Sequence, residues 1–198
     1  MTVAAGGLPA PAPGEDASSA LALVNTRLLV AGQSADLAGD AVSAAGWLAE
    51  RGLVPPGATV GDAGAARLRA LREAVRALFE AGAEGRAPSP GDVSLLNAAL
   101  AATPLAPALA WDEGGPRRGE QSLDPAADPV GVALARLAGD ALGLLTRSGH
   151  PAPAPCRAHG CIRWYLRTHA ARQWCSDRCG DRVRAARHYA RRQTESDN

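Results

Sequence analysis

All four cysteines of the 198-residue chain lie in its last quarter. They form two close pairs, Cys156-x4-Cys161 and Cys175-x3-Cys179, separated by thirteen residues. Each close pair can close a small chelate loop, and thiolate sulfurs bind Zn²⁺ at about 2.3 Å in closed, tetrahedral structural sites. The spacing therefore predicts one structural zinc ion held by all four cysteines.

Disulfides and a mixed ligand set are the alternatives to this site. The chain start lacks the pattern of a signal peptide, so we expect a cytoplasmic protein, in which disulfides are rare. His159 could replace one cysteine, but four thiolates already complete a tetrahedral site. The surrounding segment has few apolar residues, so zinc must supply on the order of 10 kcal/mol of its folding free energy.

Arginines are concentrated around and after the cysteines. Residues 156–192 hold ten arginines against two aspartates, a charge of +8, whereas residues 1–155 hold 11 arginines against 16 acidic residues, a charge of −5. Such asymmetry points to a polyanionic partner for the basic part. The alternatives are a solvated face in an arginine-rich protein, or a surface that docks on the acidic N-terminal part.

A helix should carry these arginines away from the zinc site. Ser176 can cap a helix that runs from Asp177 to about residue 192. Spacings of three and four residues place its arginines in two neighbouring stripes. Their guanidinium groups suit the phosphates of duplex DNA, and one in the major groove could read guanine. The candidate nucleic-acid-binding residues are Arg178, Arg182, Arg184, Arg187, Arg191 and Arg192.

The elements that position this segment are mostly helical. Apolar spacing predicts two helices joined by a turn over residues 20–53, and a clear amphipathic helix over residues 62–83. A shorter helix should end near Thr103, and another should span residues 130–147. Residues 107–125 contain Gly-Gly-Pro between apolar runs, which indicates a β-hairpin. The predicted fold class is therefore mainly α with a minor β-hairpin: a helical N-terminal domain plus a small four-cysteine zinc-finger domain with a C-terminal helix.

One polar triplet in the N-terminal part, Asn25, Thr26 and Arg27, follows an apolar run. It could line a ligand pocket, or it could be a hydrogen-bonding cluster at a helix end. The sequence contains no phosphate-binding glycine loop, open metal site or nucleophile motif that we can identify. We therefore expect no catalytic residues and no enzymatic activity.

The C-terminal motif resembles the CGNR zinc finger of bacterial stress-induced transcription regulators. Trp174-Cys175-Ser176 and Cys179-Gly180-Asp181-Arg182 carry the resemblance, together with the upstream cysteine pair. Leu21-Ala22-Leu23-Val24-Asn25-Thr26-Arg27 is similar to the opening of the ABATE domain that precedes this finger in the family. Asp181 stands where the signature has Asn, and Arg167 and His169 replace its usual Asp and Ser. The resemblance covers about residues 20–192 and implies zinc bound by the four cysteines, with a DNA-binding role for the finger.

These observations predict a zinc-binding, DNA-binding transcription regulator; the alternative is a zinc-stabilised protein–protein interaction module without direct DNA binding. The expected partners are duplex DNA, a second copy of the chain, and a small-molecule effector on the N-terminal domain. We expect no membrane association, because we see no apolar run that approaches the roughly 20 residues of a membrane span. The predicted divisions are a disordered leader (1–18), an ABATE-like helical domain (19–148), a Pro/Ala linker (149–155), a CGNR-type zinc finger (156–192) and a disordered tail (193–198).

Overall fold

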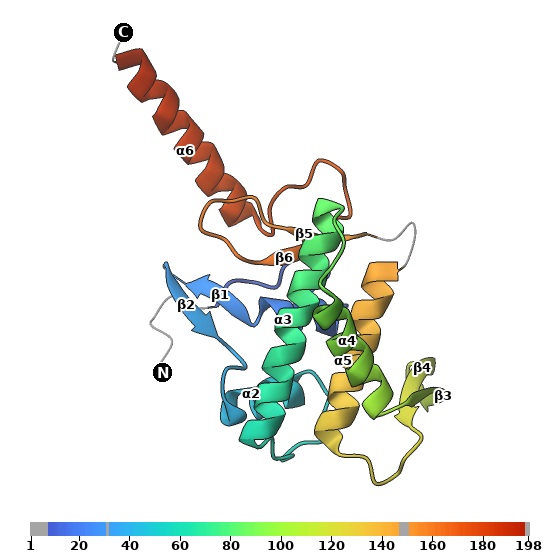
Figure 1. The fold of residues 1–198 in the computed structure, drawn as a ribbon. Helices are drawn as coiled ribbons and strands as arrows, with labels where there is room; N and C mark the ends of the chain where they lie inside the picture. The colour runs from blue at the N-terminus through green and yellow to red at the C-terminus, as the bar shows by residue number, and fades with distance from the viewer. Residues whose placement is uncertain (1–7, 31, 147–150, 197–198) are drawn as a thin grey trace.

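The computed structural model describes residues 8–30, 32–146 and 151–196. These residues form six α-helices and three two-stranded antiparallel sheets (Figure 1), which confirms a mainly α fold with a small zinc-finger segment and a C-terminal helix. In chain order the elements are α1 (Ser19–Asn25), β1 (Arg27–Val30), β2 (Gln33–Asp36), α2 (Ala41–Glu50), α3 (Asp62–Glu84), α4 (Pro90–Ala102), β3 (Leu105–Asp112), β4 (Gly115–Ser122), α5 (Pro129–Thr146), β5 (Pro153–Pro155), β6 (Trp164–Leu166) and α6 (Asp177–Ser196).

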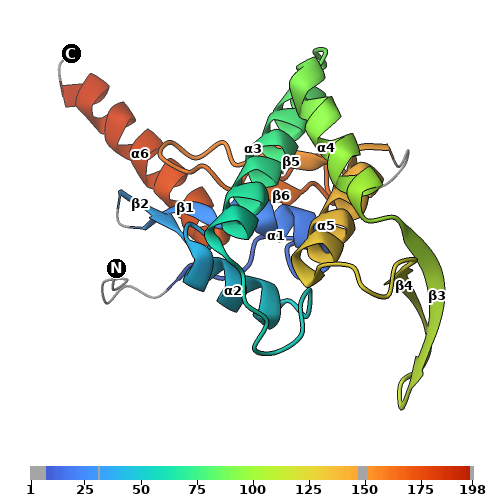
Figure 2. The ribbon, with the colours of Figure 1, turned by 60° about the horizontal axis from the view of Figure 1, so that its bottom comes forward.

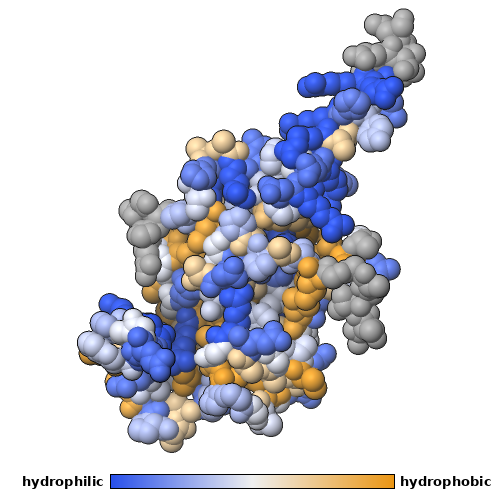
Figure 3. Space-filling view, turned by 180° about the vertical axis from the view of Figure 1, so that it is seen from behind, coloured by the Kyte–Doolittle hydropathy of each residue, from blue (hydrophilic) through white to orange (hydrophobic). Residues whose placement is uncertain are grey.

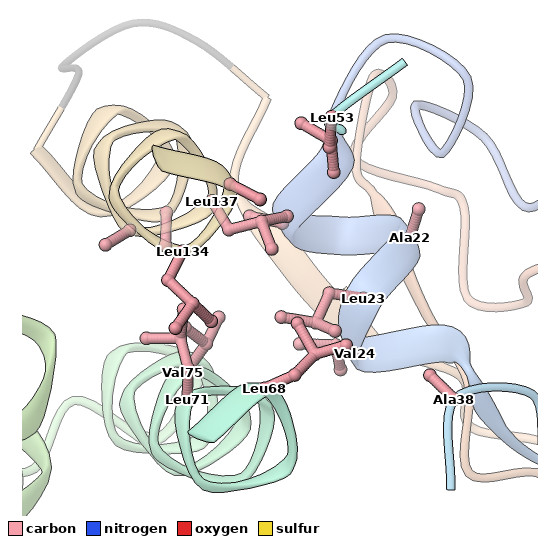
Figure 4. Packing of buried hydrophobic residues seen from close by; sticks show 14 of the residues in the cluster. Ala22, Leu23, Val24, Ala38, Leu53, Leu68, Leu71, Val75, Leu134 and Leu137 are labelled. Carbon is pink, nitrogen blue, oxygen red and sulfur yellow. The ribbon is translucent and has the colours of Figure 1, made fainter. Parts of the chain in front are cut away.

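Helix α3 is the centre of the main core. Its predicted apolar face is buried from Leu68 to Phe79, and Gly85 ends the helix in the left-handed conformation. Figure 4 shows Leu134 of α5 reaching toward Val75 of α3, while Leu68 of α3 lies beside Val24 of α1. Burying each large apolar side chain contributes about 1.5–3 kcal/mol, so this face stabilises the whole N-terminal part.

Helix α5 begins where the sequence indicated. The Asp128 carboxylate accepts hydrogen bonds from the backbone N–H groups of Val130 and Gly131, at 3.2 and 3.1 Å, and so caps the helix. With 18 residues, α5 is long and apolar enough to span a membrane by length and composition alone. However, Leu134 and Leu137 are buried and the helix packs against α1, α3 and α4, so its apolar face belongs to the core.

The region from residue 20 to 53 differs from the two helices that we predicted. Helix α1 ends at Asn25, and a hairpin of β1 and β2 precedes α2. A distant residue holds this hairpin: the Asp36 carboxylate accepts two hydrogen bonds from the Arg72 guanidinium, at 2.6 and 2.8 Å. Burial would raise the pKa of Asp36, but the bonds from Arg72 and from the Ala38 N–H outweigh it and lower the pKa below 3.8.

The predicted hairpin between α4 and α5 is confirmed. Strands β3 and β4 pair from Leu105↔Ser122 to Asp112↔Gly115, and Gly115 has a φ of 94° in the turn. Figure 2 shows this hairpin extending away from the helices. Trp111 is 73% exposed on it, so the hairpin adds no large side chain at that position to the core.

Three predicted irregular segments have more structure than expected. Residues 8–18 of the predicted leader pack on the protein: Ala12 is buried and Glu15 forms an ion pair with Arg163 at 2.6 Å. Within the predicted linker, Pro153–Pro155 forms β5, which pairs with β6. Proline lacks an N–H donor, but an edge strand such as β5 tolerates it because only one side of the strand is paired. Helix α6 continues to Ser196, past the predicted end. Residues 1–7, 149–150 and 197–198 of these predictions lie outside the described residues.

Candidate metal centre

The four cysteines meet at the start of α6. Cys156 follows β5, Cys175 precedes α6, and Cys179 lies in the first turn of that helix. All four sulfurs lie within 4.8 Å of one another. The Sγ atom of Cys175 is 3.7 Å from that of Cys161 and 3.8 Å from that of Cys179, and all four are free thiols.

These distances fit one zinc ion. Four sulfurs at about 2.3 Å from a tetrahedral centre lie about 3.8 Å from one another. The distances of 3.7 and 3.8 Å from the Cys175 sulfur to those of Cys161 and Cys179 match that edge. Cys156, Cys175 and Cys179 are at most 8% exposed, so the site is closed, as structural zinc sites are. The predicted ligand chemistry is confirmed: the cysteine cluster of this finger can hold one metal ion.

The proton affinities of the clustered thiols differ sharply. Hydrogen bonds from the thiols of Cys161 and Cys175 lower the pKa of Cys156 to about 2. The shared bond with Cys156 raises the pKa of Cys161 to about 11 and also raises the pKa of Cys175. Without a cation the cluster therefore keeps protons on at least two of its sulfurs at neutral pH, and a divalent ion must displace them to bind four thiolates.

Backbone contacts bring the two cysteine pairs together. The Cys156 N–H donates to the Arg163 carbonyl at 2.9 Å, and the Arg157 N–H donates to the Gln173 carbonyl at 3.0 Å. The Cys175 N–H lies 3.4 Å from the Cys156 sulfur, in position to stabilise a thiolate. The finger thus orients its ligands through its own backbone.

The start of α6 follows its predicted cap. The Ser176 hydroxyl accepts a hydrogen bond from the Cys179 N–H at 3.3 Å. This cap holds the first turn of the helix, and with it one ligand, next to the other cysteines. The zinc site and the direction of α6 are therefore set by the same few residues.

The aromatic residues of the finger divide between two cores. Tyr165 is fully buried beside the cysteines, and its hydroxyl donates to the Arg172 carbonyl at 2.7 Å. Trp164 points the other way and joins the main core, where its ring lies 5.7 Å from that of Phe79. Alternation along β6 explains the split, because successive strand residues face opposite sides.

Hydrogen bonds join the finger to the N-terminal helices. The Asn25 side chain donates to the Trp164 carbonyl at 2.9 Å and accepts from the Trp164 N–H at 2.8 Å. Arg76 of α3 donates to the carbonyls of Ile162 and Val24, at 3.1 and 3.0 Å. Burial lowers the pKa of the Arg76 guanidinium from its ordinary value. The finger is therefore fixed on the N-terminal part by paired polar groups as well as by the Trp164 ring.

The polar triplet of the N-terminal part lies where α1 ends and β1 begins, beside this interface. Asn25 and Thr26 are buried, and Thr26 donates to the Leu23 carbonyl and accepts from Arg72 at 2.8 Å. Arg27 pairs with Glu73 at 3.2 Å. These contacts match the helix-end hydrogen-bonding cluster that was one of our two interpretations; the pocket interpretation stays a prediction.

The arginines of α6 lie on exposed turns of the helix. Figure 3 shows the helix as a hydrophilic projection away from the body of the protein. Arg184 pairs with Asp181 at 2.6 Å, and its guanidinium lies 5.8 Å from the centre of the Trp174 ring. Arg182 approaches the Cys179 sulfur at 3.8 Å. Asp181, at the position of the signature Asn, thus orients an arginine on the solvent side.

The sequence did not reveal the roles of Glu15, Arg72 and Arg76. Their partners are distant in the chain, and an arginine beside an apolar stripe is usually solvated. One signal was present: Arg72 and Arg76 are four residues apart and directly follow Leu71 and Val75 of the apolar face. That placement puts both at the edge of the buried side of α3.

Comparison with known families accounts for most of the chain. Residues 17–148 match the ABATE family, described as "Putative stress-induced transcription regulator", and residues 154–192 match the CGNR zinc finger. Both matches agree with the sequence resemblance. A comparison with curated proteins finds no match. The chain therefore belongs to the ABATE family and carries a CGNR zinc finger with the four cysteines Cys156, Cys161, Cys175 and Cys179.

Proposed function

We propose that the protein is a DNA-binding transcription regulator in which zinc holds α6 in position to contact duplex DNA. The observation that carries the proposal is the exposed, arginine-rich α6 rooted in the cysteine cluster (Figure 1). A 20-residue helix is about 30 Å long and 10–12 Å wide, and the major groove of DNA is about 12 Å wide. Shape and charge therefore both suit DNA.

Under this proposal the arginines of α6 fall into two groups by their position on the helix. Arg178 and Arg182 lie near the zinc site, where their position is most strongly fixed. Arg184, Arg187 and Arg191 form a stripe along one side of the helix, and Arg192 adds a charge next to it. Phosphate contacts from these residues would supply most of the affinity, which would be strongly salt-dependent.

The two family matches support regulation rather than catalysis. Both are regulator or zinc-finger families, not enzyme families. We propose that the protein has no catalytic activity and acts in the cytoplasm. A homodimer is part of the proposal because a single finger buries little DNA surface, and useful affinity needs a second finger or partner. We also propose that residues 19–148 and 156–192 form two domains.

Salt-dependent binding tests the proposal. The zinc-loaded full chain would be titrated with a fluorescent DNA duplex at several salt concentrations, beside a variant with Arg184→Ala, Arg187→Ala and Arg191→Ala. Each lost phosphate contact reduces the slope of log K against log salt by about 0.9, so we expect a reduction of about 2–3.

A matched variant controls for net charge. Arg67→Ala, Arg117→Ala and Arg118→Ala remove the same charge from exposed sites of the N-terminal part, and this variant should keep the parent slope. If neither parent nor variants bind duplex DNA at low salt, the zinc-stabilised protein–protein interaction module becomes the better account of α6. Equal slope losses in both triple variants would mean that α6 has no special role.

A further inference from the structure

A cleft separates the C-terminal half of α3 from the finger. Its volume is about 670 Å³, which lies within the range of small-molecule sites. Glu80 and Ala83 line it from α3, and Ile162 and Trp164 line it from the finger. Because its walls come from both parts of the chain, a ligand that fills it would contact the N-terminal helices and the finger together.

Arginine dominates the charged lining of this cleft. Arg76, Glu80 and Glu84 line it from α3, and Arg157, Arg163 and Arg167 line it from the finger. The Arg163 charge is balanced by Glu15 at 2.6 Å, and Glu84 is paired with Arg86. No ion pair to Arg76, Arg157 or Arg167 is found among the described residues, which leaves three guanidinium groups and the Glu80 carboxylate in the lining without an ion-pair partner there.

Two buried donors in the wall also lack acceptors. Within the described residues, the Nε atoms of Arg76 and Arg163 are covered and have no hydrogen-bond partner. Arg163 is only 6% exposed, so its guanidinium is held in place under the cleft surface. A covered N–H group without an acceptor is unfavourable, and an anion in the cleft would interact favourably with the charge of Arg76, which has no ion-pair partner among the described residues.

The remaining wall is apolar. Pro153 and Pro155 of β5 lie beside Ile162, while the exposed side chains of Arg157 and Arg167 stand at the rim. A ligand with an apolar body could rest on these residues and on Ala83 of α3, and reach the rim arginines with one acidic group. We propose that this cleft binds a small organic anion, a molecule with an apolar body and a carboxylate, sulfonate or phosphate group.

This proposal is independent of DNA binding by α6. Protein–DNA interfaces cover about 1,000 Å² or more of protein surface. A cleft of about 670 Å³ instead has the size of a site for one small molecule. Its occupant would strengthen the docking of the finger on α3, since it contacts both. It would therefore adjust how firmly α6 is held relative to the N-terminal helices.

The test uses 1-anilinonaphthalene-8-sulfonate as a fluorescent organic anion and phenyl phosphate as its competitor. The zinc-loaded full chain should bind the probe saturably, and phenyl phosphate should displace it while sodium chloride at equal ionic strength does not. Arg157→Glu with Arg167→Glu should raise the dissociation constant at least about tenfold. Both sites are exposed, and zinc content measured beside the titration confirms that the finger is intact.

A second charge reversal provides the control. Arg117→Glu with Arg118→Glu, on the distant β4, should leave probe affinity unchanged. Phenyl phosphate should also shift the NMR signals of Ile162 and Ala83. Absence of saturable binding, or equal effects of both double variants, would overturn the proposal. So would displacement of the probe by duplex DNA but not by phenyl phosphate, because the cleft would then be a DNA contact.

Discussion

Replacing Asn25 with alanine should weaken the attachment of the finger to the N-terminal helices. Its side chain makes two hydrogen bonds to the Trp164 backbone and a third to the Glu15 carboxylate at 2.9 Å. Trp164 is 2% exposed, so truncation leaves its N–H and its carbonyl buried without this partner. An unsatisfied buried group costs about 1–3 kcal/mol, so the two groups together predict a loss of about 2–6 kcal/mol.

Urea unfolding of the zinc-loaded protein measures this loss. Asn25→Asp keeps the shape but replaces the donating NH₂ with an acceptor that faces Glu15 and the Trp164 carbonyl, so at neutral pH it should be at least as destabilising as alanine. Asn97→Ala is the control, because Asn97 is exposed in the middle of α4. If Asn25→Ala and Asn97→Ala both stay within about 0.5 kcal/mol of the parent, the reasoning about the interface is refuted.

Three further results are expected. Gly14→Ala should destabilise the protein by about 1–3 kcal/mol in thermal unfolding, because its Cβ would lie 2.5 Å from Leu166 Cγ; Gly57→Ala, with a similar φ but open space, separates this clash from backbone strain. Trp164→Ala should cost about 3–5 kcal/mol and speed loss of zinc to a chelator, and unchanged stability would argue against the shared core. Zinc binding at pH 7 should release about two protons or more, because the pKa of Cys161 and that of Cys175 are raised; affinity should therefore increase with pH, and calorimetry that detects no proton release would contradict this.

Local patterns were sufficient for the elements that bury one regular face. The apolar spacing of α3 and the Gly-Gly-Pro turn after β3 each determine their element through near neighbours, and both predictions are confirmed. The cysteine spacing likewise encodes the metal site, because chelate loops are short.

Contacts between distant residues account for what was missed. The run from Arg27 to Asp36 forms a hairpin rather than a helix because Arg72, 36 residues further along, binds Asp36. Glu15 orders the segment before α1 by pairing with Arg163. Neither partner is visible from local periodicity, since a charged residue gives the same pattern whether it is solvated or paired.

Backbone NMR of the zinc-loaded protein during titration with duplex DNA tests the central claim most directly. If zinc positions α6 for DNA, the amide signals that shift should fall on α6 between Arg178 and Arg192, while those of α3 and the β3–β4 hairpin stay in place. Shifts confined to the N-terminal helices, or none at a salt concentration low enough for phosphate binding, would contradict the account.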